Sequence, residues 1–197
     1  MLSILIPSRS EGAVHEFIKE LEATVPCSEI IVCSDPNSRG KGWALREAFK
    51  VAKGSEIAFI DGDGEIPARM LLRLLPFLQD FDVVVGSKRI TKSTLRRKVM
   101  THVTRIWFRF LFGVSVDTQT GIKLFRRKAL ESLSGGWEAN SWIFDAEIIA
   151  RLQRQGLRIV EVPIECEIRR QLAVKTIWKI FMESLWLKSR LLLPVKP

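Results

Sequence analysis

Short apolar runs that end in polar or glycine-rich residues recur along the first half of the chain. They occupy residues 2–6, 29–33, 56–60 and 82–86. Apolar runs of this length, bounded by turn-forming residues, predict buried strands. The first run ends at Pro7, and the second ends in "SDPNSRGKG", a dense turn signal.

Between these runs, apolar positions recur three or four residues apart, which predicts helices over residues 11–25, 43–53 and 67–80. In the first of these the apolar side chains are Val14, Phe17, Ile18, Leu21 and Val25. Pro67 suits the first turn of the third helix. Strands that alternate with helices predict an α/β fold with a largely parallel sheet.

The second half of the chain has a less regular pattern. Helices are predicted over residues 94–112 and 142–155, the second ended by Gly156, and a last strand over 157–162. Between the helices, "GVSVDTQTGIKLF" alternates turn and strand signals.

Composition narrows the class of protein. The 197 residues are 47% hydrophobic and carry a net charge of +9, so we expect one globular domain with an anionic partner. Three cysteines without a C-x-x-C pair favour a reducing compartment over a disulfide framework or a zinc site. No apolar run approaches the roughly 20 residues of a membrane-spanning helix, and the N-terminus reads as a strand rather than a signal peptide. A cytoplasmic protein, soluble or peripherally attached to a membrane, is expected.

Charged residues follow several of the predicted strands. Asp61 and Asp63 lie one glycine apart in "DGDG", directly after the strand at residues 56–60. Ligands of parallel sheets bind beyond the carboxyl ends of the strands, and Mg²⁺ is typically held there by one or two carboxylates plus substrate phosphates. The pair therefore fits metal-bridged binding of a nucleotide diphosphate, although an ordinary acidic turn has the same composition.

Three further segments carry candidate chemistry. Lys41 stands between two glycines at a helix start, which favours an anion, although a plain helix start reads the same. Asp117 and Lys123 lie in a segment that also reads as a solvated turn. Asp145 and Glu147 are two positions apart on a predicted helix, so only one is expected to face a cleft.

Together, in this order, these segments resemble the inverting GT-A-fold glycosyltransferases of the dolichyl- or polyprenyl-phosphate hexosyltransferase type. The family motifs I-P-x-x-N-E, G-K-G-x-A, D-A-D, G-S-R, D-x-x-x-G-F-K-x-F and W-x-F-D-x-E correspond to "IPSRSE", "GKGWA", "DGDG", "GSKR", "DTQTGIKLF" and "WIFDAE". The last two motifs are the most specific and are closest to the dolichyl-phosphate glucosyltransferase branch. The resemblance covers roughly residues 2–168 and implies a Rossmann-like, mixed but mainly parallel sheet flanked by helices.

The resemblance also implies roles for individual residues. The nucleotide sugar is expected to be bound by Pro7, Ser8, Glu11, Asp35, Lys41, Asp61, Gly62 and Asp63. The phosphates and the acceptor are expected to be bound by Lys88, Arg89, Arg105, Lys123 and Asp145. Asp61 and Asp63 would hold Mg²⁺ or Mn²⁺, with Asp63 the more direct ligand. Asp63 and Asp117 are the expected catalytic residues, and Asp145 and Glu147 would line the far wall of the cleft.

The implied reaction is metal-dependent transfer of a hexose, with inversion, from a UDP- or GDP-sugar to a polyprenyl phosphate. The chain departs from the family pattern after Cys33, where Ser34-Asp35 replaces two adjacent acids and a strand and helix are missing. Arg9 and Ser10 replace the usual aromatic residue and asparagine. A catalytically impaired protein that binds a membrane or a partner is therefore the alternative.

The chain after residue 170 has a different character, so we divide it into a glycosyltransferase domain, 1–170, and an amphipathic segment, 171–197. Trp and basic residues surround an apolar stripe in this segment, which is typical of a helix lying on a membrane surface. Docking onto the domain, or onto a second subunit in a homo-oligomer, is the other interpretation. Nucleic-acid binding has only the net charge in its favour, so no nucleic-acid partner is expected.

Overall fold

The computed structural model describes the backbone of residues 1–8, 14–35, 37–87, 95–114, 116–118, 120–133, 137–141, 143–167 and 174–192. In the two longest helices, side chains are described for residues 102–112 and for 178 and 180–190.

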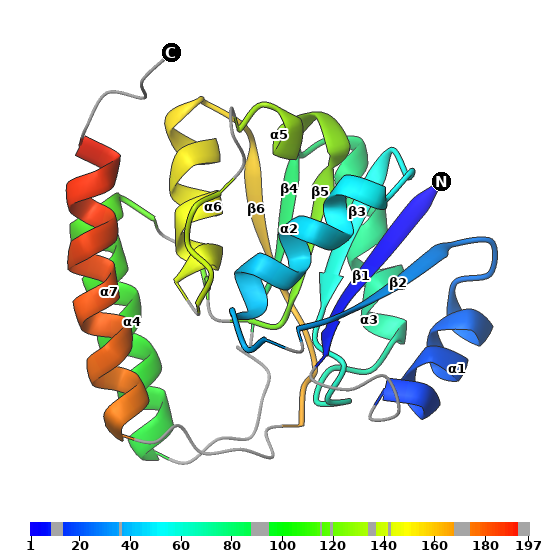
Figure 1. The fold of residues 1–197 in the computed structure, drawn as a ribbon, viewed down its shortest axis with the longest axis horizontal. Helices are drawn as coiled ribbons and strands as arrows, with labels where there is room; N and C mark the ends of the chain where they lie inside the picture. The colour runs from blue at the N-terminus through cyan, green and yellow to red at the C-terminus, as the bar shows by residue number, and fades with distance from the viewer. Residues whose placement is uncertain are drawn as a thin grey trace.

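The centre of the molecule is a six-stranded mixed sheet (Figure 1). Its strands are β1 (Leu2–Ser8), β2 (Glu29–Ser34), β3 (Glu56–Ile60), β4 (Val83–Ser87), β5 (Ile122–Arg126) and β6 (Ile159–Pro163), in the order β2-β1-β3-β5-β4-β6. β1 is parallel to β2 and β3, and β4 is parallel to β6, whereas β5 is antiparallel to both β3 and β4. The α/β fold with a mainly parallel sheet is confirmed, and the segment with mixed turn and strand signals supplies its antiparallel strand.

The helices follow the predicted order with shifted boundaries. They are α1 (His15–Thr24), α2 (Lys41–Val51), α3 (Arg69–Leu74), α4 (Leu95–Phe112), α5 (Arg127–Glu131), α6 (Phe144–Arg154) and α7 (Val174–Leu192). The helix predicted over 67–80 is shorter, because it tightens after α3 into the 3₁₀ turn η2 (Leu75–Gln79). Pro76 lies at the start of η2, and its missing N–H and ring disfavour a continued α-helix. The short helix α5 was not predicted.

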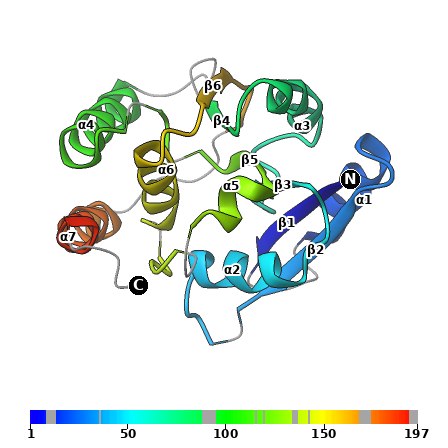
Figure 2. The same cartoon turned by 90° about the horizontal axis from the view of Figure 1, so that it is seen from above.

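Two cores of buried side chains cover the two faces of the sheet. Helices lie on both sides of the sheet in the view from above (Figure 2). On one face, Leu21 of α1 and Leu71 of α3 belong to a buried cluster with Ile4 and Ile60. The other cluster joins side chains of α2, α5 and α6 to the opposite face of the strands. Its members include Leu45, Phe59, Phe125, Trp137 and Phe144. Successive residues of β1, such as Ile4 and Leu5, belong to different cores because side chains alternate along a strand.

Helices α4 and α7 lie side by side at the margin of the molecule, next to α6 (Figures 1 and 2). The rings of Trp107 and Phe181 stack at 4.5 Å, and the Trp107 indole N–H donates to Ser184 Oγ at 2.9 Å. Leu187 of α7 is buried within the same core as α6. α7 therefore packs onto the rest of the chain, and across the described ranges no helix is long and apolar enough to span a bilayer.

Candidate functional site

The carboxyl ends of β1, β3 and β4 and the start of β5 lie at one edge of the sheet, because β5 runs in the opposite direction. Ile60 pairs with Ile122, and just beyond this pair the Asp61 N–H donates to the Gly121 carbonyl at 2.9 Å. The residues after β3 and before β5 are thus held together. Helices α2 and α6 also begin at this edge, which brings Lys41 and Asp145 close to them.

Asp61 forms an ion pair with Lys41, the first residue of α2. The Lys41 ammonium lies 2.6 Å from Asp61 Oδ1. The other carboxylate oxygen packs against the Gly121 backbone, where a Cβ would approach within 2.3 Å of Asp61 Oδ2. Glycine is therefore required at position 121 for this orientation of Asp61. Lys41 and Asp61 come from different motifs, and both were predicted to bind the nucleotide sugar; the ion pair brings them together.

A second ion pair lies deeper in the fold. Lys123 Nζ is 2.9 Å from Asp145 Oδ1 and donates to the Thr120 carbonyl at 2.5 Å. Only 1% of Lys123 and 7% of Asp145 is exposed. Burial lowers the pKa of Lys123 and raises the pKa of Asp145, each against the opposing pull of its partner's charge.

The two ion pairs form one cluster of alternating charges. Burial alone would lower the pKa of Lys41, but the negative charges of Asp61 and Asp145 outweigh it and the net pKa is raised. The Lys41 ammonium also lies 5.5 Å from the centre of the Phe144 ring. Lys41 therefore stays protonated at neutral pH between two carboxylates.

The start of α2 is fixed by the segment that precedes α6. The Gly42 N–H donates to the Asn140 carbonyl at 2.8 Å, and the Trp137 indole N–H donates to the Gly42 carbonyl at 2.8 Å. Arg46 binds the Trp137 carbonyl and the Asn140 side chain. Gly40 has a φ of 120°, and a Cβ there would lie 2.2 Å from the Asn140 carbonyl oxygen. The two glycines beside Lys41 therefore permit a close backbone contact that fixes the position of the ammonium.

Asp63 differs from Asp61 in its surroundings. It is exposed, and its Oδ1 accepts a hydrogen bond from the Glu65 N–H at 3.1 Å. Across the described residues, no group of three or more His, Cys, Asp or Glu side chains is arranged to hold a metal ion. Two carboxylates alone still suit a Mg²⁺-type ion whose remaining ligands are substrate phosphates and water.

Asp117 is buried in the loop before β5, and its position is fixed by a residue that the sequence did not indicate as functional. Its backbone N–H donates to Glu161 Oε2 at 3.0 Å. The same oxygen accepts from Arg105 of α4, which forms an ion pair with Glu161. The one available signal was a glutamate flanked by valines in the predicted last strand. Glu161 thus links the Asp117 loop to α4.

The other predicted site residues fall into three groups. Pro7, Ser8 and Gly62 lie at the carboxyl ends of β1 and β3, as expected from the topology. Glu11, Lys88 and Arg89, and also Arg9 and Ser10, lie outside the described residues. Asp35 caps its own loop, because its carboxylate accepts from the Gly40 N–H at 2.5 Å and pairs with Arg39 at 3.4 Å.

Four residues that were expected at the cleft contact other groups of the protein in the structure. Lys123 and Asp145 bind each other in the interior, and Arg105, whose side chain is 27% exposed, pairs with Glu161. Glu147 does not line a cleft: it is fully buried, with Oε2 accepting from the Ala139 N–H at 2.7 Å. The helix directs Asp145 and Glu147 to different sides, as their spacing predicted.

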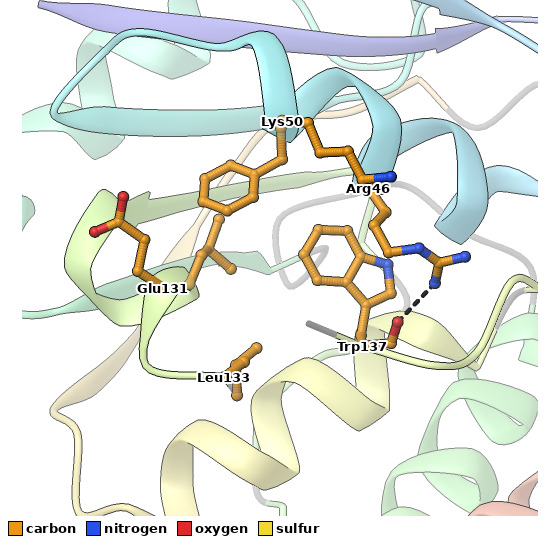
Figure 3. A pocket seen from close by; sticks show the side chains of 7 residues that line it. Arg46, Lys50, Glu131, Leu133 and Trp137 are labelled. Carbon is orange, nitrogen blue, oxygen red and sulfur yellow. Dashed lines mark hydrogen bonds between the residues drawn. The ribbon is translucent and has the colours of Figure 1, made fainter. Parts of the chain in front are cut away.

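Away from this cluster, a mostly apolar cavity of about 230 Å³ lies between α2, α5 and Trp137 (Figure 3). Phe49, Leu130, Leu133 and Trp137 form its walls, with charged groups from the flanking helices at its border. The contact of Arg46 with the Trp137 carbonyl, drawn in Figure 3, belongs to the bonding that fixes α2. The cavity includes no member of the charge cluster.

Proteins of known function resemble this chain in sequence. A family model for glycosyl transferase family 2 matches residues 4–134. Glycosyltransferase AglD of Haloferax volcanii is 33% identical over 135 residues, which cover 65% of this chain and 22% of that protein. Dolichyl-phosphate beta-glucosyltransferase of Saccharomyces cerevisiae is 29% identical, covering 64% and 44%, and undecaprenyl-phosphate mannosyltransferase of Micrococcus luteus is 27% identical, covering 64% and 52%. The chain thus spans about half or less of the length of these relatives.

Solved structures show the same fold. Glucosyl-3-phosphoglycerate synthase of Mycobacterium tuberculosis, in complex with Mn²⁺, UDP-glucose and glycerol 3-phosphate, superposes with a TM-score of 0.73 at 15% identity. The superposition covers 100% of this chain and 82% of that one. The fold is therefore that of the GT-A glycosyltransferases. Because the family match extends over well more than half of its residues, the chain belongs to glycosyl transferase family 2.

Proposed function

We propose that this protein transfers a hexose from a nucleotide diphosphate sugar to a polyprenyl phosphate at a membrane surface, with inversion at the anomeric carbon. The proposal rests on the Lys41–Asp61 ion pair and the neighbouring Asp63 at the carboxyl edge of the sheet, in a chain that belongs to glycosyl transferase family 2. The names of two relatives, a dolichyl-phosphate glucosyltransferase and an undecaprenyl-phosphate mannosyltransferase, support the acceptor class.

In this reaction an oxygen of the lipid phosphate forms a bond to the anomeric carbon from the face opposite the leaving group. The bond from that carbon to the diphosphate breaks, and its electron pair leaves with the nucleoside diphosphate. Negative charge therefore builds up on the diphosphate. The Lys41 ammonium, held at this edge and protonated, can stabilise that charge.

The two aspartates fit a divalent cofactor, with Asp63 exposed as the first ligand and Asp61 beside it. Mg²⁺ or Mn²⁺ bound there would act as a Lewis acid on the departing diphosphate. A strong general base is less necessary here than for a sugar hydroxyl, because a phosphate nucleophile is already ionised at neutral pH. Asp117 is the candidate for orienting the acceptor or acting as base, since Glu161 fixes its loop at this edge.

The exposed face of α4 and α7 supports attachment to a membrane. Large apolar side chains lie on its outer surface: Val103, Ile106, Phe110, Trp178, Met182, Leu185 and Trp186. Phe110 is 79% exposed and Trp178 is 65% exposed. Aromatic side chains beside basic residues, such as Trp186 beside Arg190, suit the headgroup region of a bilayer. We therefore assign this face to the lipid that carries the acceptor.

Transfer is tested with radiolabelled UDP- and GDP-hexoses, polyprenyl phosphate in vesicles, and Mg²⁺ or Mn²⁺. We expect a labelled lipid product from at least one donor, its formation abolished by EDTA and reduced at least about 100-fold by Asp63→Asn. Asp80→Asn, an exposed carboxylate after η2, is the matched control and should retain full activity. Metal-independent product formation that survives Asp63→Asn would contradict the assignment.

One observation favours the alternative, a catalytically impaired protein that binds membranes. Asp35 stands where the family places its nucleotide-recognising acids, yet its carboxylate is used within its own loop. The alternative predicts vesicle binding without product from any donor. In that case UDP and GDP would also leave the melting temperature unchanged in the presence of Mn²⁺.

A further inference from the structure

The Lys41–Asp61 ion pair occupies one of the two carboxylates that would hold a divalent ion. Lys41 Nζ lies 2.6 Å from Asp61 Oδ1, while Asp61 Oδ2 packs against Gly121. The Asp61 side chain is still 30% exposed, so a divalent ion can reach it, but an ion bound to Oδ1 would lie close to the Lys41 ammonium. The Lys41 ammonium and a divalent metal ion are both cations, so they compete for the Asp61 carboxylate.

The buried lysine of the cluster, Lys123, cannot take the place of Lys41 at Asp61. Lys123 is bound to Asp145 and to the Thr120 carbonyl, and it is almost completely buried. Asp145 also attracts the Lys41 ammonium, but its ion-pair partner is Lys123, whereas Lys41 pairs with Asp61. Because Lys123 and Asp145 pair with each other, Lys41 and Asp61 remain each other's ion-pair partners.

A bound diphosphate would change this balance. The N–H groups of Gly40 and Gly42 at the start of α2 are already bonded, to Asp35 and to the Asn140 carbonyl. The strongest available partner for a diphosphate at this helix start is therefore the Lys41 ammonium. Ammonium–phosphate contacts are charge-assisted, and the diphosphate carries more negative charge than one carboxylate.

We propose that Lys41 is a positioning residue that holds Asp61 in the ligand-free protein, and that it moves to the donor diphosphate when the donor binds. This inference rests on the proposed function and adds a rule for the order of binding. Asp61 becomes a metal ligand only when the diphosphate has taken the ammonium. The divalent ion consequently binds weakly alone and tightly together with the nucleotide.

The test measures Mn²⁺ binding directly, from the loss of the free-ion EPR signal, without any activity assay. Wild type, Lys41→Gln, Lys41→Arg and Lys50→Gln are titrated with Mn²⁺ alone and with preformed Mn²⁺–UDP and Mn²⁺–GDP. Lys50→Gln removes the same charge from the exposed end of the same helix, where Lys50 pairs with Glu47, three positions before it, at 2.7 Å. Circular dichroism and melting temperatures establish that each variant is folded.

We expect Lys41→Gln to bind Mn²⁺ alone roughly ten-fold more tightly than wild type, since a neighbouring positive charge is removed. The same variant should bind the Mn²⁺–nucleotide complex more weakly than wild type. Lys41→Arg retains the positive charge and should keep weak binding of Mn²⁺ alone. Lys50→Gln should stay within about two-fold of wild type, because its charge is screened by solvent.

Two outcomes would overturn the inference in different ways. If wild type binds Mn²⁺–nucleotide but Lys41→Gln binds Mn²⁺ alone no more tightly than wild type or Lys50→Gln, the inference fails and the proposed function stands. If wild type binds neither Mn²⁺–UDP nor Mn²⁺–GDP, the metal-dependent reaction and the inference fail together.

Discussion

At the scale of single residues, Asp145 and Glu147 show how two carboxylates of one helical turn take different roles. Asp145 faces Lys123 within the charge cluster. Glu147 instead accepts hydrogen bonds from the N–H groups of Glu138 and Ala139 and pairs with Arg151 at 2.7 Å. Glu147 thereby fixes the segment that carries Asn140, which in turn fixes the start of α2.

Glu147→Gln tests this structural role. An amide offers one acceptor oxygen and turns N–H donors toward backbone N–H groups, so we expect a loss of about 1–3 kcal/mol in the free energy of unfolding, measured with urea. Glu138→Gln is the matched control, because Glu138 pairs with the same Arg151 but half of its side chain is exposed. The control should change the free energy by less than about 0.5 kcal/mol. Equal effects in both variants would contradict the role of burial.

Part of the site could be predicted from single residues. Asp61 and Asp63 directly follow an apolar run, so their place at a carboxyl strand end follows from topology alone. The Lys41–Asp61 contact could not be predicted, because it depends on the close approach of Gly40 and Gly42 to Asn140, about 100 positions away. The inward direction of Lys123 was also not indicated, since a lysine in a strand is usually exposed.

At the scale of elements, several of the described side chains hold α7 to α4. Trp107, Phe181 and Ser184 contact each other, and Lys188 donates to the Leu111 carbonyl at the end of α4. Ser141, just before α6, donates to Glu183 Oε2 at 2.5 Å. α7 thus contacts both α4 and the segment that fixes α2.

Leu187→Ala tests the docking of α7. Leu187 is 1% exposed, so its truncation should leave a cavity and reduce the stability of the helix pair by about 2–4 kcal/mol. Faster amide hydrogen exchange in α7 and α4 is the expected observation. Trp186→Ala, the adjacent residue on the outer face, should leave exchange nearly unchanged, because 45% of that side chain is exposed. Unchanged exchange in Leu187→Ala would mean that α7 is held in another way.

Most elements were predictable from periodicity, and the exceptions have physical causes. β5 is short and preceded by turn residues, so its strand signal is weak, and its antiparallel direction is set by pairing with β3 and β4 rather than by local residues. α5 has only five residues, fewer than two helical turns, and follows β5 without a loop. The packing of α7 onto α4 was an open alternative, because an amphipathic stripe fits a protein surface and a bilayer equally well.

At the scale of the whole molecule, a net charge of +9 is combined with an outer apolar face on α4 and α7. We expect binding to vesicles that contain anionic lipid, with affinity that falls as NaCl rises, because basic residues near such a surface are screened by salt. Co-sedimentation with anionic and neutral vesicles measures both effects. Equal binding to the two kinds of vesicle at low salt would contradict the electrostatic contribution.

The double variant Phe110→Ser, Trp178→Ser tests the apolar contribution on the same molecule. Both side chains are mostly exposed, so folding should be little affected, whereas vesicle affinity should fall at least about ten-fold through lost apolar burial. Val51→Ser, Leu72→Ser is the matched control, since these exposed apolar residues lie on α2 and α3, outside the proposed face. A similar loss of vesicle affinity in the control would indicate nonspecific hydrophobic adsorption rather than binding through a defined face.

The hydrogen bond between Ser141 and Glu183 has a thermodynamic consequence. It joins α7, through Asn140 and the start of α2, to the ammonium that neutralises Asp61. If binding of α7 to a lipid surface alters the Ser141–Glu183 hydrogen bond, the presence of vesicles will change the affinity of the protein for the nucleotide. Linkage is reciprocal, so the nucleotide must then change the affinity for vesicles by the same factor. A loaded enzyme would in that case reside longer, or more briefly, at the surface that supplies its second substrate.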